Sequence, residues 1–244
     1  MPERPEPYMK GMIPTLNHRG FMLERLDLYS QQFVDYAGTV DSEVLDIGCA
    51  YGNATQAALK NGARVLACDM DEGHLQIVIR ETADDMRDRL RTEVGVLPDV
   101  DFSTESLGAI LCSRVLHFLL SAEIRESLQK MHRWLIPGGR LFLVADSPYT
   151  GFWFSKAPEY ERRKAQGDEW PGLIEDVGPF FENGQIPDGM LPFMNSLDPD
   201  ILSRECRRAG FVVEKAEFFG RDMRSEGRDH AGIIARKPID GVDN

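Results

Sequence analysis

The chain has 244 residues, of which 42% are hydrophobic and 28% charged, and these values exclude fibrous and disordered classes of protein. The formal net charge of -12 predicts no nucleic-acid partner, because an acidic surface repels phosphate backbones. Neither a signal peptide nor an apolar run of about eighteen residues is found, so we expect a cytoplasmic protein with no membrane partner. Four cysteines without a C-x-x-C pair predict reduced structural thiols and no metal site: Cys49, Cys68, Cys112 and Cys206.

The first segment, residues 1–40, is predicted to be a helical cover with one amphipathic helix over Leu23–Tyr36. The second segment, residues 41–146, alternates short apolar runs with amphipathic stretches. Four runs have the length and composition of strands that are buried on both faces: Val44–Ile47, Arg64–Cys68, Leu107–Cys112 and Leu141–Ala145. Three stretches have helical periodicity: Ala54–Lys60, Asp71–Arg91 and Ala122–Leu135.

The third segment, residues 147–198, interrupts the sheet and is rich in aromatic residues such as Tyr149, Trp153 and Trp170. These rings need burial, so the segment either has a small core of its own or lines a substrate pocket at the carboxyl edge of the sheet, and both can hold together. We therefore predict a substrate cap.

The fourth segment, residues 199–244, completes the core with a helix over Asp200–Ala209 and two strands, Phe211–Phe219 and Ala231–Arg236. The whole order predicts an α/β fold with a doubly wound, mostly parallel seven-stranded sheet, helices on both faces and a C-terminal antiparallel hairpin.

The stretch VLDIGCAYGNAT, residues 44–55, combines a buried strand, a glycine turn and the start of a helix. Gly48 allows backbone torsions and a close ligand approach that other residues deny, and a side chain at Gly52 would collide with the ligand or the turn. The G-x-x-x-G spacing and the preceding Asp46 argue against a dinucleotide, whose pyrophosphate this carboxylate would repel. A ligand that carries an ammonium group fits better.

A second acid, Asp69, ends the next strand about twenty residues after the glycine turn, where an acid accepts ribose hydroxyls. A purely structural role for Asp69 would be to cap the following helix, yet Asp71 already fills that role. Met70 follows, and its soft side chain is suited to lie against adenine.

From Glu43 to Pro148 the chain resembles the class I (Rossmann-like) S-adenosylmethionine-dependent methyltransferases, in their small-molecule branch. The resemblance rests on VLDIGCAYG, VLACDMD, FSTESLGAILCSRVLHFL and LIPGGRLFLV, and covers somewhat under half of the chain. It implies that S-adenosylmethionine is the cofactor and that Asp69 binds its ribose. The residues implied for its methionine part are Asp46, Gly48, Cys49, Ala50 and Gly52.

The resemblance also implies that the ends of the third and fourth strands hold the adenine and the methionine carboxylate, at Val96, Leu97, Ser113 and Arg114. One departure concerns the adenine: where the family commonly has G-D-A, this chain has Gly95-Val96-Leu97. The Val96 side chain cannot accept a hydrogen bond, so adenine recognition is expected from backbone groups, with Asp99 nearby.

Enzymes of this kind accelerate the reaction mainly by aligning the reacting atoms in a pocket that excludes water. A base is needed only if the nucleophile must lose a proton. His117 follows the fourth strand and is either that base or a structural histidine. Asp146 and Tyr149 follow the fifth strand and are expected to orient the substrate. His18 and Arg19 either fold over the cofactor or stay in an exposed loop. The remaining histidines are expected on element surfaces: His74, His132 and His230.

The sequence thus predicts methyl transfer from S-adenosylmethionine to an oxygen or nitrogen of a small-molecule metabolite, by a monomer or homodimer. Three alternatives remain open. A nicotinamide-dependent oxidoreductase is disfavoured by Asp46. A non-catalytic S-adenosylmethionine-binding regulatory protein would keep the cofactor pocket alone, and a protein or peptide methyltransferase is compatible with the acidic surface.

Overall fold

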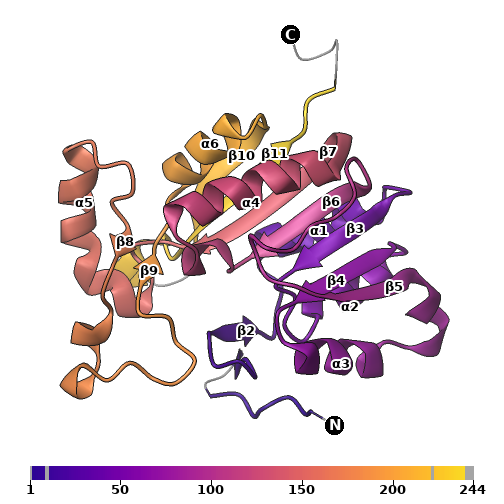
Figure 1. Ribbon diagram of the computed structural model, residues 1–244, viewed down its shortest axis with the longest axis horizontal. Coiled ribbons are helices and arrows are strands. Elements are labelled where there is room, and N and C mark those ends of the chain that lie inside the picture. The colour runs from indigo at the N-terminus through magenta and orange to yellow at the C-terminus, as the bar shows by residue number, and fades with distance from the viewer. Residues whose placement is uncertain (1, 9–10, 221–222, 240–244) are drawn as a thin grey trace.

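The structure is a computed structural model that describes residues 2–8, 11–220 and 223–239 (Figure 1). Its centre is a seven-stranded sheet in the order β10-β11-β7-β6-β3-β4-β5. Strands β3 to β7 pair in parallel, whereas β11 lies antiparallel between β7 and β10. The fold class predicted from the sequence is therefore confirmed. The strands are β3 (Glu43–Ile47), β4 (Val65–Asp69), β5 (Leu90–Val94), β6 (Leu107–Ser113), β7 (Leu135–Asp146), β10 (Val212–Phe219) and β11 (His230–Arg236).

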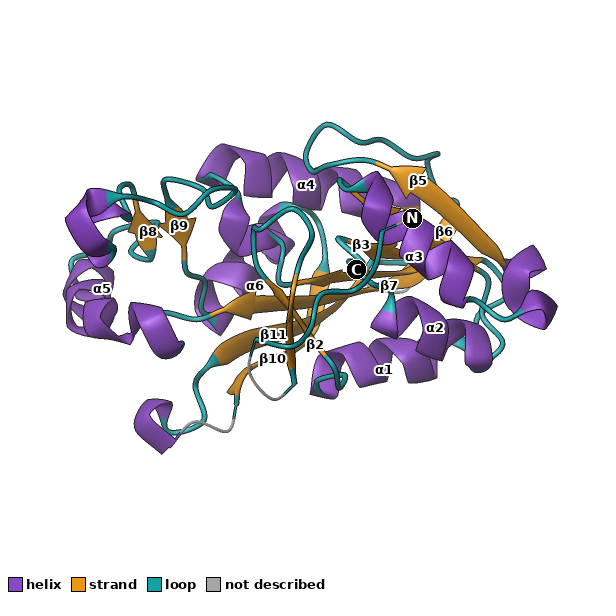
Figure 2. Cartoon of the chain, turned by 90° about the horizontal axis from the view of Figure 1, so that it is seen from below, coloured by secondary structure: helices purple, strands orange, loops and turns teal. Residues whose placement is uncertain are grey.

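Helices cover both faces of this sheet (Figure 2). One face carries α1 (Leu28–Ala37), α2 (Asn53–Lys60) and α3 (Glu72–Glu81), and the other carries α4 (Ser121–Trp134) and α6 (Pro199–Arg208). A separate apolar cluster fills the space under each helical layer. The central strands are consequently buried on both sides, which is why they read as continuous apolar runs in the sequence.

Strand β3 shows how this alternation places the first candidate residue. Leu45 and Ile47 pack into the cluster beneath α4, whereas Val44 packs into the cluster beneath α1 and α2. Because side chains alternate along a strand, Asp46 points with Val44 toward α2. The carboxylate therefore lies beside the start of that helix, at the carboxyl end of the strand.

The N-terminal segment differs from its prediction. The helix α1 begins at Leu28 because the Asp27 carboxylate caps it, accepting the backbone N–H groups of Tyr29 at 3.0 Å and Ser30 at 2.9 Å. The residues before it form a small antiparallel hairpin, β1 (Met12–Pro14) and β2 (Phe21–Leu23). Such three-residue strands leave no periodic signal in the sequence.

The helix expected over residues 71–91 ends at Glu81, and its last residues belong instead to a short 3₁₀ helix and to β5. Strand β5 lies at the edge of the sheet and has charged residues at alternate positions. Because its charged residues resemble the polar face of a helix, the start of this strand is predicted from the sequence as part of the preceding helix. The boundary was wrong, while the neighbouring helix itself is present.

The inserted segment, residues 147–198, contains α5 (Ala157–Ala165) and a two-stranded sheet of β8 (Leu173–Ile174) and β9 (Met194–Asn195). Figure 1 shows these elements standing out beyond one end of the large sheet. The segment leaves and rejoins the core at one place, where the Leu197 N–H donates to the Asp146 carbonyl at 3.0 Å.

The first and last predicted segments also extend over residues 1, 9–10, 221–222 and 240–244, which lie outside the described residues. Among the helices that are described, none combines the length and the apolar character needed to cross a bilayer.

Candidate cofactor site

A cavity lies where the carboxyl ends of β3, β4 and β6 meet the N-terminal segment. The cavity and the solvent-filled space at its mouth together enclose about 1170 Å³. Residues between 15 and 30 form the wall opposite the strand ends. The predicted cofactor residues in its lining are Asp46, Gly48, Cys49, Ala50, Asp69, Met70, Val96, Leu97, Ser113 and Arg114. Gly52 is not part of the lining.

The two glycines of the turn are required by protein neighbours. Gly48 has φ of +73°, and a Cβ atom there would lie 2.3 Å from Cγ2 of Val115. Gly52 has φ of +75°, and its Cβ would lie 2.7 Å from Cγ2 of Val78 in α3. Both left-handed conformations disfavour any residue with a side chain. The turn is thus fixed by packing before any ligand approaches it.

Asp46 is a buried carboxylate at the deep end of the cavity. Its Oδ2 accepts a hydrogen bond from the Thr55 hydroxyl at 2.7 Å. Burial raises the pKa of Asp46 to about 6, although the hydrogen bonds from Thr55 oppose that effect. A positively charged group beside this carboxylate would restore its ionised form.

Asp69 is held by three donors. Its Oδ2 accepts the backbone N–H of Ala50 at 2.8 Å, and its Oδ1 accepts the N–H of Asp71 and Nδ1 of His74, each at 2.9 Å. A carboxylate offers about four acceptor positions. One acceptor position therefore remains open to a ligand hydroxyl. The three existing hydrogen bonds fix the orientation of the carboxylate and so the direction of that position.

His74 is a functional candidate that the sequence reasoning missed. It was expected on a helix surface, but it is fully buried and lines the cavity. Its Nε2 accepts the backbone N–H of Leu16 at 2.9 Å, so the proton of the neutral ring is on Nδ1, which donates to Asp69. The N-terminal segment covers this helix face, and helical periodicity gives no sign of such a long-range contact.

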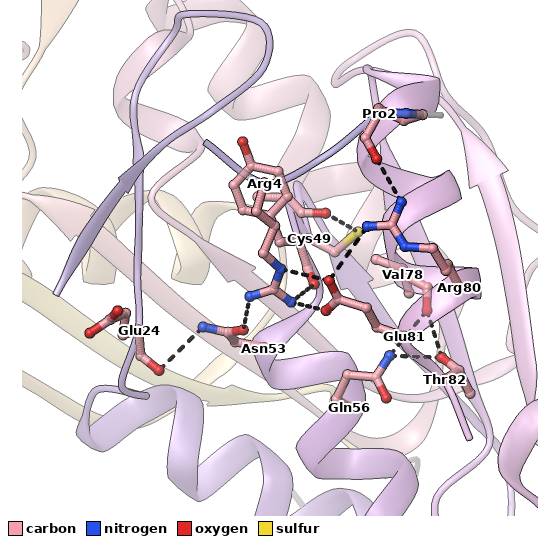
Figure 3. A network of polar contacts seen from close by, with 12 residues as sticks. Pro2, Arg4, Glu24, Cys49, Asn53, Gln56, Val78, Arg80, Glu81 and Thr82 are labelled. Carbon is pink, nitrogen blue, oxygen red and sulfur yellow. Dashed lines mark hydrogen bonds and ion pairs between the residues drawn. The ribbon is translucent and has the colours of Figure 1, made fainter. Parts of the chain in front are cut away.

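Other contacts tie the N-terminal segment to the turn and to α3 (Figure 3). The Tyr51 hydroxyl donates to the Pro14 carbonyl at 2.6 Å, and the Asn53 amide donates to the Leu23 carbonyl at 2.8 Å. Further out, Arg4 donates from Nε to Glu81 at 3.1 Å. The wall of the cavity is thus attached by residues of the glycine-turn motif itself.

The side of the cavity expected to hold adenine is apolar. The side chains of Met70 and Val96 line it and are each 38% exposed. Leu97 lies behind them and is buried. Asp99, expected nearby, is not part of the lining.

Arg114 provides an unsatisfied donor. This residue adopts φ of +59°, and its Nη1 donates to Asp27 at 2.7 Å and to the Ser113 hydroxyl at 3.1 Å. Burial acts to raise the pKa of Asp27, but the Arg114 charge and the hydrogen bonds from Arg114 and Ser30 together lower that pKa. Its Nη2 is buried and has no hydrogen-bond partner within the described residues. A buried guanidinium N–H of this kind fits a carboxylate ligand.

Two more arginines, Arg19 and Arg25, line the cavity from either side of β2. Within the described part of the chain, neither guanidinium group has a carboxylate partner. Phe21 and Leu26 contribute apolar surface to the same wall.

The three residues predicted for chemistry lie near the ends of β6 and β7 and are not in the cavity lining. His117 is buried; its Nδ1 accepts the Asp146 N–H at 3.1 Å, and its Nε2 lies 4.0 Å from Asp146 Oδ2. Asp146 Oδ1 also lies 3.1 Å from Nδ1 of His230. The Tyr149 hydroxyl donates to Glu161 of α5. The structure therefore brings His117 and Asp146 together and places Tyr149 against the inserted segment.

Burial is the main cause of a lowered pKa for His117, which agrees with a neutral ring whose Nδ1 accepts a hydrogen bond. Burial acts to raise the pKa of Asp146, but His117, the hydrogen bond with His230 and the Arg114 charge together lower that pKa. Asp146 is consequently an ionised carboxylate that orients its neighbours.

The parallel sheet, the glycine turn and the two acids at successive strand ends form an arrangement suited to a ligand at the carboxyl edge of an α/β sheet. Residues 44–139 match the family model described as a methyltransferase domain. A demethylmenaquinone methyltransferase from Clavibacter sepedonicus is 31% identical over 107 residues, which are 44% of this chain and 42% of that protein. The match thus spans less than half of the relative's length.

Solved structures confirm the fold. A methyltransferase from Methanosarcina mazei superposes with a TM-score of 0.64 at 17% identity, covering 88% of this chain and all of the other. A 1,6-didemethyltoxoflavin N1-methyltransferase from Burkholderia thailandensis, solved with its substrate and S-adenosylhomocysteine, gives 0.58 at 16% identity, covering 87% of this chain and 79% of the other. Residues 44–139 therefore resemble a methyltransferase domain, and the chain has the fold of these methyltransferase structures.

Proposed function

We propose that the protein transfers the methyl group of S-adenosylmethionine to an oxygen or nitrogen atom of a small-molecule metabolite. One observation carries this proposal: the cavity offers matching groups for the ribose, the ammonium group and the carboxylate of the cofactor. Asp69 has an acceptor position for a ribose hydroxyl, Asp46 suits the ammonium group, and the unpartnered Nη2 of Arg114 suits the carboxylate. When bound, the cofactor would supply a methyl group on a positively charged sulfur, and the sulfur would leave as the acceptor atom bonds to the methyl carbon.

The walls of the cavity support a small acceptor. The N-terminal segment closes the side opposite the strand ends with Phe21 and Leu26, and Phe118 adds a further ring. Phe118 also packs against the apolar cluster of the inserted segment that contains Trp153, which links the cavity wall to the proposed substrate cap. Two of the three proteins named above, the demethylmenaquinone methyltransferase and the 1,6-didemethyltoxoflavin N1-methyltransferase, act on small molecules according to their names.

The residues near the ends of β6 and β7 are proposed to serve the acceptor. His117 keeps its proton on Nε2, because Nδ1 accepts the Asp146 N–H, so the neutral ring acts as a donor and not as a base in this arrangement. Asp146 is the ionised group that orients the acceptor. Tyr149 fixes the junction with α5 through Glu161.

The direct test uses cofactor carrying a labelled methyl group, incubated with the protein and with two fractions of a cell extract, one of small metabolites and one of macromolecules. We expect label in the metabolite fraction, and an Asp69→Ala variant should greatly reduce it. Label in proteins or peptides instead would support the peptide methyltransferase alternative. Binding of the cofactor without any labelled acceptor would support a regulatory protein.

A further inference from the structure

The N-terminal segment and the ribose-binding acid are connected through a single side chain, His74. One ring nitrogen accepts the Leu16 N–H from the segment, and the other donates to Asp69 Oδ1, both at 2.9 Å. The edge of the ring faces Tyr51, at 4.9 Å between ring centroids. Full burial leaves no water to replace either hydrogen bond.

The two bonds depend on each other through the tautomer. Nε2 accepts from Leu16 only while it carries no proton, which places the proton of the neutral ring on Nδ1, facing Asp69. Loss of the Leu16 contact would free the ring to rotate, and the Asp69 carboxylate would lose one of its three donors. The carboxylate is therefore best oriented when the N-terminal segment is closed.

We propose that His74 is a positioning residue that couples closure of the N-terminal cover, residues 11–25, to binding of the cofactor ribose at Asp69. This inference rests on the proposed function only through binding of the cofactor. Coupling of this kind is reciprocal: a bound ribose stabilises the closed cover, and the closed cover strengthens ribose binding.

Two substitutions separate the halves of the connection. His74→Asn keeps a donor close to the position of Nδ1, for Asp69, and leaves no acceptor for Leu16. His74→Gln keeps an acceptor close to the position of Nε2 and loses the donor to Asp69. Arg4→Ala is a matched control, because Arg4 fastens the same segment through Glu81 without contacting His74.

The measurement is hydrogen exchange at the amides of Thr15 and Glu24, with and without S-adenosylhomocysteine. Their acceptors, the carbonyls of Gly20 and Gly11, belong to the cover itself and survive every substitution. In the wild type and in Arg4→Ala, the ligand should slow exchange by about tenfold, within the range of known coupling. In both His74 variants the slowing should fall below about twofold, with weaker ligand binding by calorimetry.

The outcomes are distinct. If the wild type binds the ligand and exchange in the cover does not change, or if either folded His74 variant keeps the full slowing, His74 is merely structural and the coupling is overturned. A wild type that fails to bind S-adenosylhomocysteine at all would instead sink the proposed function.

Discussion

Asp46 is predicted to report the arrival of the cofactor's ammonium group. Its pKa of about 6 means that the free protein holds part of a proton there near pH 6. A cation beside the carboxylate lowers that pKa, so binding should release a proton and S-adenosylhomocysteine affinity should rise as pH increases through about 6. Calorimetry in two buffers of different ionisation enthalpy measures the release.

Asp46→Asn should abolish this release, whereas a substitution of the exposed Asp41 should not change it. The same shift affects stability in the free protein. Because the folded pKa lies above the usual value of 3.8, Asp46 lowers the free energy of unfolding as pH rises from about 4 to about 6. The absence of any effect of Asp46→Asn in both experiments would contradict the assignment.

Arg114 is predicted to recognise the carboxylate end of the cofactor. Arg114→Ala should weaken S-adenosylhomocysteine by about 2 kcal/mol, roughly thirtyfold, and leave 5′-methylthioadenosine, which lacks the amino-acid part, nearly unaffected. Calorimetry with both ligands measures the difference. Since Arg114 also compensates Asp27, the melting temperature of Arg114→Ala must be recorded, and Arg114→Lys provides a variant that keeps the charge. Equal weakening of both ligands would refute the carboxylate role.

Asp69 should act at the other end of the ligand. Removing its remaining acceptor position by Asp69→Ala is expected to cost about 2 kcal/mol for S-adenosylhomocysteine and for 5′-methylthioadenosine alike, because both carry the ribose. Competition binding with the two ligands tests this. An Asp69→Ala protein that is folded and binds both ligands like the wild type would show that the ribose lies elsewhere.

At the scale of elements, the glycine turn between β3 and α2 is held by α3 and by the residues that follow β6. Gly48→Ala should therefore destabilise the fold by at least about 1 kcal/mol in denaturant unfolding, because its φ is +73° and its Cβ would meet Val115. Adding Val115→Ala should recover the steric part of the loss and not the backbone part. If Gly48→Ala alone left the free energy of unfolding unchanged, the turn would not be fixed by packing.

The elements that sequence reasoning predicted well are those whose signal is local. Buried parallel strands such as Val44–Ile47 are largely apolar runs, and Asp69 is the last residue of another such strand. The hairpin β1–β2 and the buried His74 were missed because long-range contacts, such as that between Tyr51 and Pro14, create them. Edge strand β5 was merged with a helix because half of it is exposed. No local pattern encodes these features.

At the scale of the whole molecule, the net charge of -12 argues for an acceptor other than nucleic acid. We expect no measurable binding of a labelled RNA or DNA duplex at about 0.1 M salt, since no counterions would be released by so acidic a surface. Fluorescence anisotropy over a salt series tests this. Tight binding that weakens steeply with salt would point to a basic patch and to a nucleic-acid substrate.

The hydrogen bond between Leu197 and Asp146 joins the two ends of the inserted segment. An inserted segment that leaves and rejoins the core at one point does not separate β7 from α6. Its length therefore has little effect on the stability of the sheet. We therefore expect changes in length or sequence there to alter the proposed substrate cap while the cofactor cavity stays constant. Selectivity and cofactor use can in this way diverge independently within a single fold.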